Sequence, residues 1–119
     1  HVAGDACLQA VAGAVARSVG REEDLAARYG GEEFAVIMPQ TDAAGALQVA
    51  EAIRMAVEAL QIAHAASANG VVTISLGAAT ALPGPGTELG QLIHTADCAL
   101  YRAKHLGRNR ISLPESTLT

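Results

Sequence analysis

The sequence RYGGEEFAVIM occupies residues 28–38 and decides the fold. Gly30 and Gly31 lie between two extended runs, and such a pair is typical of a tight hairpin turn because glycine tolerates positive φ. Without side chains, the turn also lets a ligand approach the backbone. Glu32 and Glu33 follow at once, and carboxylates at a rigid strand end offer the oxygen ligands that Mg²⁺ prefers. The stretch predicts a hairpin with a phosphate and metal site, although so short a pattern is also typical of a solvated acidic turn.

The segments on either side of this stretch alternate between helical and extended patterns. Apolar residues three and four apart indicate helices, and β-branched or apolar runs bounded by turn residues indicate strands. The resulting order is helix, strand, strand, helix, strand, helix, strand, at residues 5–19, 24–29, 33–38, about 42–61, 71–76, 88–106 and 110–113. This order predicts an α/β (α+β) fold, with a mainly antiparallel sheet covered by helices on one or both faces.

The two longer helices carry apolar stripes that are expected to face the core, and cap residues mark their ends. In the middle helix, which Thr41 or Asp42 can cap, the stripe is Ala46, Val49, Ala50, Ile53, Val57 and Leu60. In the last helix, which Gly107 is expected to end, the stripe is Leu89, Leu92, Ile93, Ala96, Leu100 and Ala103.

Composition limits the classes of function. The 119 residues fit a single small domain, and half of them are hydrophobic, which is enough for a core. A net charge of −4 with three aromatic residues gives no footprint for DNA or RNA. Cys7 and Cys98 lack metal-ligand spacing and are interpreted as free thiols of a cytoplasmic protein. No segment resembles a signal peptide or a membrane span, so no membrane contact is expected.

Two further pairs of residues carry chemistry that suits a nucleotide. Arg21 offers a planar fork for phosphate or a guanine edge, and Asp24 can accept guanine N–H groups, although a local surface ion pair is the alternative. Lys104 and Arg108 are four residues apart, so they lie on one side of the last helix and its exit. Two close cations can clamp a triphosphate, although cations also favour a helix C-terminus for its dipole alone.

Four segments, in order, resemble the GGDEF family of diguanylate cyclases. RYGGEEF resembles the GG(D/E)EF signature, and ADCALYRAKHLGRN at residues 96–109 resembles the family segment A-D-x-A-L-Y-x-A-K-x-x-G-R-N. HVAGD at residues 1–5 resembles H-x-x-G-D, and SLG at residues 75–77 resembles a strand end with the pattern S-x-G. The matches cover nearly the whole chain, which is identified as a member of this family, with residues 1–113 as a partial GGDEF domain and 114–119 as a tail.

The resemblance implies a reaction and a role for each matched residue. The family condenses two GTP molecules into cyclic di-GMP and two pyrophosphates with Mg²⁺ or Mn²⁺. It implies that Glu33 binds the metal, and that Glu32 assists deprotonation of the 3′-hydroxyl or helps to hold a second metal. At the family's substrate-binding positions this sequence has Asp5, which would bind the guanine base, and Gly30 and Gly31, which would contact the guanosine and its phosphate. Lys104 and Arg108 would bind the β- and γ-phosphates. Leu100 and Tyr101 are expected to be packing residues.

The resemblance also implies partners. Arg21 and Asp24 match the family's inhibitory site for cyclic di-GMP, the product. Because each domain holds one GTP, catalysis would need a homodimer with two-fold symmetry. A sensory or receiver module is expected upstream in a longer parent protein, which could be anchored to a membrane through that upstream part.

The chain departs from the family at its beginning. The family's domain starts earlier, with a strand that carries a metal-binding aspartate and a helix start that carries a guanine-binding asparagine, and neither precedes His1. In the family's sheet, that strand lies between the two strands that correspond to residues 33–38 and 71–76. Without it, both of these strands would expose unpaired edges. We therefore expect the chain to be a piece of a longer protein, inactive alone, that needs another segment or a swapped strand to close its sheet.

Two other functions remain open at this point. A catalytically silent receptor would bind cyclic di-GMP through Arg21 and Asp24 without making it, and a regulatory module would merely bind GTP. The intact Glu32–Glu33 and Lys104–Arg108 pairs favour the enzyme, because a pure receptor does not need them. Replacing Glu33 with Gln is expected to separate these functions.

Overall fold

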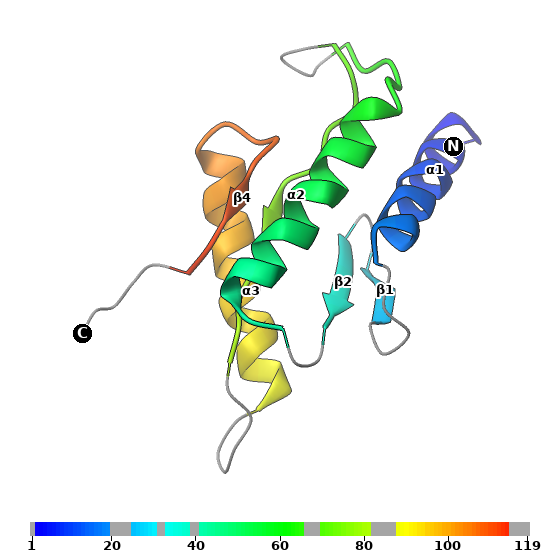
Figure 1. Ribbon diagram of the computed structural model, residues 1–119. Helices are drawn as coiled ribbons and strands as arrows, with labels where there is room; N and C mark the ends of the chain where they lie inside the picture. The colour runs from blue at the N-terminus through cyan, green and yellow to red at the C-terminus, as the bar shows by residue number, and fades with distance from the viewer. Residues whose placement is uncertain are drawn as a thin grey trace.

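The elements follow one another in the order expected from the sequence. The structure is a computed structural model that describes residues 2–19, 25–30, 33–38, 41–65, 70–81 and 88–114. The elements are α1 (Val2–Ser18), β1 (Leu25–Gly30), β2 (Glu33–Ile37), α2 (Ala43–Ala59), β3 (Leu76–Gly77), α3 (Leu89–His105) and β4 (Ile111–Ser112) (Figure 1). The predicted α+β class and element order are therefore confirmed. None of the described helices is long and apolar enough to cross a bilayer.

The hairpin forms, and β1 extends one residue further than the predicted strand. β1 and β2 are antiparallel, with Ala27 opposite Ala35. The register shifts between Arg28 and Gly30, and Gly30 pairs with Glu33. Such a shift is a β-bulge, in which one strand carries an extra residue. Gly30 is thus the last residue of β1, so the predicted strand end at residue 29 was wrong by one position, and Gly31 lies outside the described residues.

The second strand pair is parallel and short. Leu76 and Gly77 of β3 pair with Ile111 and Ser112 of β4, and the chain passes through α3 between the two strands. The strand predicted at residues 71–76 is wrong in extent, because a ladder includes only its last residue, while Val71 forms an isolated bridge with Ala63. The described residues thus contain two separate two-stranded sheets, of which the longer is antiparallel.

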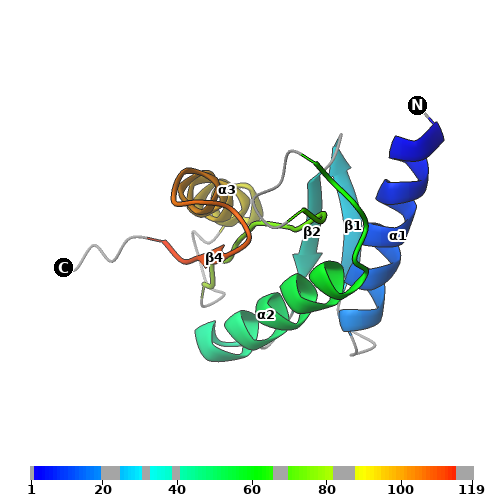
Figure 2. The ribbon, with the colours of Figure 1, turned by 90° about the horizontal axis from the view of Figure 1, so that it is seen from above.

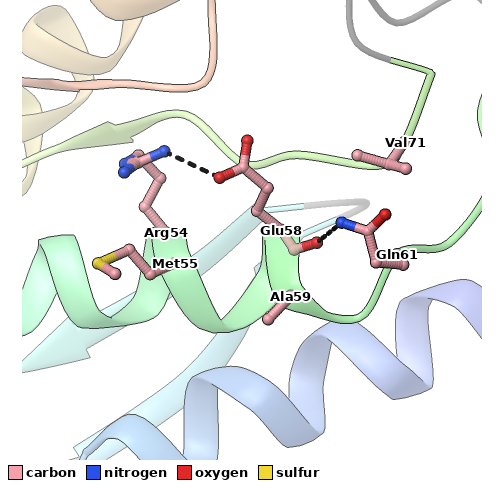
Figure 3. A pocket seen from close by; sticks show the side chains of 6 residues that line it. All are labelled: Arg54, Met55, Glu58, Ala59, Gln61 and Val71. Atoms are coloured by element: carbon pink, nitrogen blue, oxygen red, sulfur yellow. Dashed lines mark hydrogen bonds and ion pairs between the residues drawn. The ribbon is translucent and has the colours of Figure 1, made fainter.

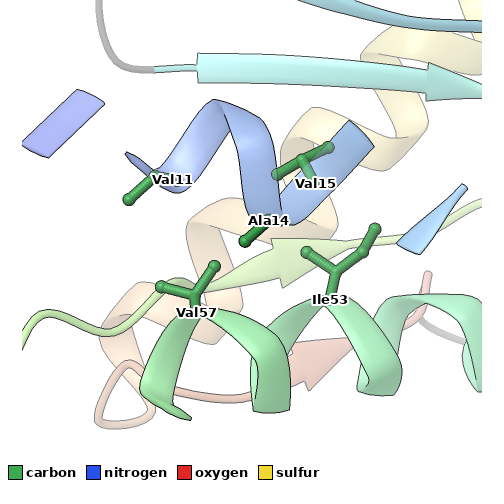
Figure 4. Close-up of a cluster of buried hydrophobic side chains, with 5 residues drawn as sticks. All are labelled: Val11, Ala14, Val15, Ile53 and Val57. Atoms are coloured by element: carbon green, nitrogen blue, oxygen red, sulfur yellow. The ribbon is translucent and has the colours of Figure 1, made fainter. Parts of the chain in front are cut away.

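The core lies between α1 and α2. Val11, Ala14 and Val15 of α1 meet Ile53 and Val57 of α2 (Figure 4). Partly buried residues from β2 and from the segment before β3 pack against this cluster, among them Phe34, Val36, Val72 and Ile74. Asp42 caps α2 as expected, since its Oδ1 accepts a 2.8 Å hydrogen bond from the Gly45 N–H. The predicted stripe of α2 is confirmed at Ala46, Ala50, Ile53 and Val57, which are all buried.

α3 covers the β3–β4 pair on the side away from α2 (Figure 2). Its buried residues are Ala99 and Ala103, whereas Leu89 is 53% exposed and Tyr101 is 64% exposed. The predicted inward position of Leu89 and the packing role of Tyr101 were therefore wrong. Tyr101 is two residues from both Ala99 and Ala103, which puts it on the opposite side of α3 from these buried residues. Leu89 is the first residue of α3 and precedes the part of the helix that contacts Gly77. Tyr101 instead stacks on His105, with ring centroids 4.0 Å apart.

Val57 provides the first test of this packing. Its side chain is fully buried, so Val57→Ala is expected to lower the free energy of unfolding by about 2 kcal/mol, through lost burial and the cavity left behind. The measurement is urea denaturation followed by circular dichroism. Met55→Ala is the matched control, because Met55 lies on the same helix and is 56% exposed, so its loss should be small. Equal losses in the two variants would contradict the core assignment.

Candidate functional site

The C-terminal end of α3 places both predicted phosphate-binding cations. Gly107 has φ +130° and follows the last turn, and the Arg108 N–H reaches back to the Ala103 carbonyl at 3.0 Å. This hydrogen bond closes a Schellman motif, which satisfies a carbonyl that the helix end would otherwise leave unpaired. The predicted stop at Gly107 is confirmed. Lys104 therefore lies half-buried in the last turn, and Arg108 lies exposed just beyond the helix.

The residue after Arg108 is tied to α2. The Asn109 side chain accepts a 3.0 Å hydrogen bond from Arg54 Nη1 and donates one of 2.9 Å to Glu58 Oε2. Its backbone N–H donates to Ser75 Oγ at 3.2 Å. The exit of α3, the middle of α2 and the segment before β3 are thus joined through one asparagine.

Arg54 is the centre of this network on α2. Its Nε and Nη2 donate to the two carboxylate oxygens of Glu51 at 3.0 and 2.5 Å, and Nη1 lies 3.6 Å from Glu58 Oε1 (Figure 3). Hydrogen bonding from Arg54 lowers the pKa of the Glu51 carboxyl below its usual range, and hydrogen bonding to Glu51 raises the pKa of Arg54. Both groups are therefore held in their charged forms.

The lowered pKa of Glu51 predicts a pH dependence of stability. A carboxyl with a depressed folded-state pKa stabilises the fold above its ordinary pKa of about 4.3, and that stabilisation disappears as the pH falls through the depressed value. We expect Glu51→Gln to be less stable than the wild type at neutral pH, with a small difference because the pair is partly exposed. Thermal unfolding from pH 7 to pH 3 should show the difference shrinking below about pH 4. A difference that grows on acidification would contradict the ion pair.

The hairpin half of the predicted site is described only in part. Gly30 ends β1 and lies opposite Glu33, which begins β2, so the strand holds the backbone of Glu33 beside the turn. Asp5 lies in the N-terminal part of α1. The other predicted site residues, Arg21, Asp24, Gly31 and Glu32, lie outside the described residues.

The predicted metal site depends on Glu32 and Glu33. The described side chains, which do not include those of Glu32 and Glu33, contain no cluster of His, Cys, Asp or Glu able to hold a metal ion. Their donor chemistry fits Mg²⁺ or Mn²⁺, which prefer carboxylate oxygens. The backbone of Glu33 pairs with Gly30 at the start of β2.

A groove along α2 does not coincide with the predicted nucleotide site. It has a volume of about 420 Å³ and lies between the C-terminal half of α2 and Val71. Figure 3 shows its lining, which consists of Arg54, Met55, Glu58, Ala59, Gln61 and Val71. The groove is open, and neither Lys104 nor Arg108 lines it. We therefore give it no role in holding a nucleotide.

No pattern in the sequence predicts the network around Arg54. Asn109 is separated in the sequence from Glu58 by 51 positions and from Arg54 by 55 positions. No local pattern signals contacts over such separations. The only signal was the spacing of Glu51, Arg54 and Glu58, which puts three charges on one face of α2. That spacing is common on helices and does not indicate a partner beyond the helix.

Comparison with known proteins agrees with this geometry. The family described as "Diguanylate cyclase, GGDEF domain" matches residues 1–110. Diguanylate cyclase A of Treponema denticola is 41% identical over 118 residues, which are 99% of this chain and 31% of that protein. Response regulator PleD of Caulobacter vibrioides is 44% identical over 113 residues, which are 93% of this chain and 24% of that protein. The chain thus spans about a third or less of the length of these relatives.

Solved structures show the same fold. The GGDEF domain of DgcB from Caulobacter crescentus, determined in complex with c-di-GMP, superimposes with a TM-score of 0.83 at 37% identity. The match covers 98% of this chain and 67% of that one. The α+β fold with its β-hairpin is therefore the fold of GGDEF domains. The chain belongs to the family described as diguanylate cyclase, GGDEF domain.

Proposed function

We propose that this chain is part of the catalytic domain of a diguanylate cyclase, which joins two GTP molecules into cyclic di-GMP and two pyrophosphates. The observation that carries the proposal is the family match over residues 1–110, within which GGEEF, Lys104 and Arg108 are all present. In each half-reaction a 3′-oxygen forms a bond to the α-phosphorus of the other GTP. The bond from that phosphorus to the bridging oxygen breaks, and pyrophosphate leaves.

Each site residue has a proposed part in this reaction. The 3′-hydroxyl proton passes to Glu32, and Glu33 supplies carboxylate oxygens for a divalent cation. Lys104 and Arg108 neutralise the β- and γ-phosphates, which become the leaving pyrophosphate. Gly30 and Gly31 let the guanosine and its phosphate approach the backbone, and Asp5 accepts hydrogen bonds from the guanine. Phosphoryl transfer depends chiefly on such positioning and charge neutralisation.

A divalent cation, Mg²⁺ or Mn²⁺, would supply charge neutralisation at the phosphates and make the attacking hydroxyl more acidic. Glu33 and Glu32 are the residues that would hold it. The backbone of Glu33 supports this role, since it is fixed opposite Gly30 at the start of β2.

The assembly and its regulation are also part of the proposal. Two domains, each with one GTP, would face one another as a homodimer. Cyclic di-GMP would bind at Arg21 and Asp24 and inhibit its own synthesis. We place the reaction in the cytoplasm, where GTP is available, under the control of a sensory or receiver module elsewhere in the protein. The complex of the DgcB domain with c-di-GMP supports a product site in this fold.

The test is an assay of the full-length protein with GTP and Mg²⁺, in which products are separated by chromatography and identified by mass spectrometry. Cyclic di-GMP and two equivalents of pyrophosphate are expected. A folded dimer that binds cyclic di-GMP but makes none would replace the enzyme with the receptor. The isolated 119-residue chain, assayed in parallel, is expected to be inactive.

A further inference from the structure

The exit of α3 has a backbone conformation that its side chains do not favour. Gly107, Arg108 and Asn109 have φ angles of +130°, +64° and +49° in succession. Glycine adopts such angles freely, and asparagine tolerates the left-handed region, but for arginine this conformation costs about 1 kcal/mol or more. The surrounding contacts must therefore hold Arg108 in this conformation.

The position of the Arg108 side chain depends on this backbone. The side chain is exposed, so packing against a neighbour does not fix its direction. The contacts of Arg108 that hold its conformation are those of its main chain: its N–H donates to the Ala103 carbonyl at 3.0 Å, and its carbonyl accepts from Arg110 Nε at 3.2 Å. The direction of the Arg108 side chain is thus set by the backbone conformation of the two residues that flank it, Gly107 and Asn109.

Asn109 is the flanking residue that is held from outside the loop. Its side-chain oxygen and nitrogen are both used, one by Arg54 at 3.0 Å and the other by Glu58 at 2.9 Å, and its N–H donates to Ser75 at 3.2 Å. Both side-chain partners are ionised groups, whose hydrogen bonds are stronger than neutral ones. This arrangement can supply the free energy that the left-handed conformation costs.

Arg54 is itself a rigid anchor. Its side chain is only 18% exposed, and Glu51 binds it through two hydrogen bonds of 3.0 and 2.5 Å. The guanidinium group is therefore oriented before it meets Asn109. A restrained arginine on the long helix α2 transmits the position of that helix to the loop after α3.

We propose that Arg54 and Glu58 are positioning residues, which hold Asn109 so that Arg108 points toward the β- and γ-phosphates of a guanosine triphosphate. The inference rests on the proposed function, because it assigns Arg108 to the nucleotide. Neither Arg54 nor Glu58 touches the substrate, and their effect passes through Asn109.

The test measures binding of GTP and of guanosine by calorimetry in the full-length protein. Arg54→Met is expected to raise the dissociation constant of GTP roughly tenfold, the value of one charge-assisted contact, and to leave that of guanosine unchanged. In the double variant with Arg108→Ala, the loss of GTP affinity should equal that of Arg108→Ala alone, because both substitutions remove the same contact with the phosphates. Arg102→Met is the charge-matched control: it removes a cation from the same end of α3, where the side chain binds the Leu113 carbonyl.

A second set of variants separates positioning from folding. Asn109→Gly keeps the left-handed conformation available but removes both side-chain hydrogen bonds, so it should weaken GTP binding as Arg54→Met does. Glu58→Gln keeps an oxygen acceptor for Asn109 and should bind GTP more tightly than Glu58→Ala. Melting temperatures within a few degrees of that of Arg102→Met would show that these losses do not come from unfolding.

The outcomes also distinguish this inference from the proposed function. GTP binding that depends on Arg108 but not on Arg54 or Asn109, or additive losses in the double variant, would overturn the positioning role alone. A wild-type protein that binds no GTP would overturn the proposed function, and the positioning role with it.

Discussion

Replacing Gly77 with alanine is expected to lower the free energy of unfolding by about 3 kcal/mol. A Cβ on this residue would lie 2.1 Å from the Ala96 carbonyl oxygen and 2.3 Å from the Leu100 backbone nitrogen. Both atoms belong to the backbone of α3, so no side chain can rotate away to make room. The helix would have to move off β3, and the small side chains on its contact face would lose their packing.

Gly90→Ala is the matched control for this prediction. Gly90 is exposed in the first turn of α3, and a Cβ there would meet nothing within 4 Å. Alanine favours a helix more than glycine does, so this variant should be more stable than the wild type by about 0.5 kcal/mol or more. Urea denaturation of both variants provides the comparison. If Gly77→Ala were as stable as the wild type, α3 would not lie directly on β3.

Replacing Glu33 with glutamine is expected to reduce formation of cyclic di-GMP by about 100-fold or more, by analogy with the loss of a single electrostatic group at other phosphate and oxyanion sites. The amide keeps the size of the side chain and one oxygen, but it loses the charge that a divalent cation requires. The pairing of Glu33 with Gly30 is made by the backbone, so it does not depend on this charge. The fold should therefore persist, and only turnover should fall.

The control for this variant is Glu88→Gln. Glu88 precedes α3, and its side chain makes no capping hydrogen bond, so turnover should stay within twofold of the wild type. Binding of cyclic di-GMP to Glu33→Gln, measured by calorimetry, should remain as in the wild type. Turnover that survives in Glu33→Gln would remove this residue from the metal site.

The order of the elements was predictable because each is signalled locally. The periodic apolar stripe of α2, its Asp42 cap and the glycine that ends α3 all act within a few residues, and all three are confirmed. The β3–β4 pairing joins Leu76 to Ile111, and nothing near either residue signals the other. The bulge in β1 also escaped prediction, since it depends on how both strands fit together.

The part of the candidate site that could be predicted is the pair of cations, because their charge and their spacing are both visible in the sequence. Lys104 and Arg108 lie at one helix end as expected from their spacing. Asn109 was noted only as a letter of a motif, because its partners on α2 become neighbours only in the folded chain. Sequence spacing reveals which residues share an element, and it does not reveal which elements meet.

The bridging position of α2 has a consequence for how the molecule opens. α2 packs on α1 through the core, and it is also tied to the loop before β4 through Arg54 and Asn109. The hairpin and the β3–β4 pair share no ladder in the described residues, so each can lose its hydrogen bonds without breaking those of the other. In native-state hydrogen exchange, the amides of the two sheets should then exchange through separate partial openings, while those in the middle of α2 exchange only on global unfolding.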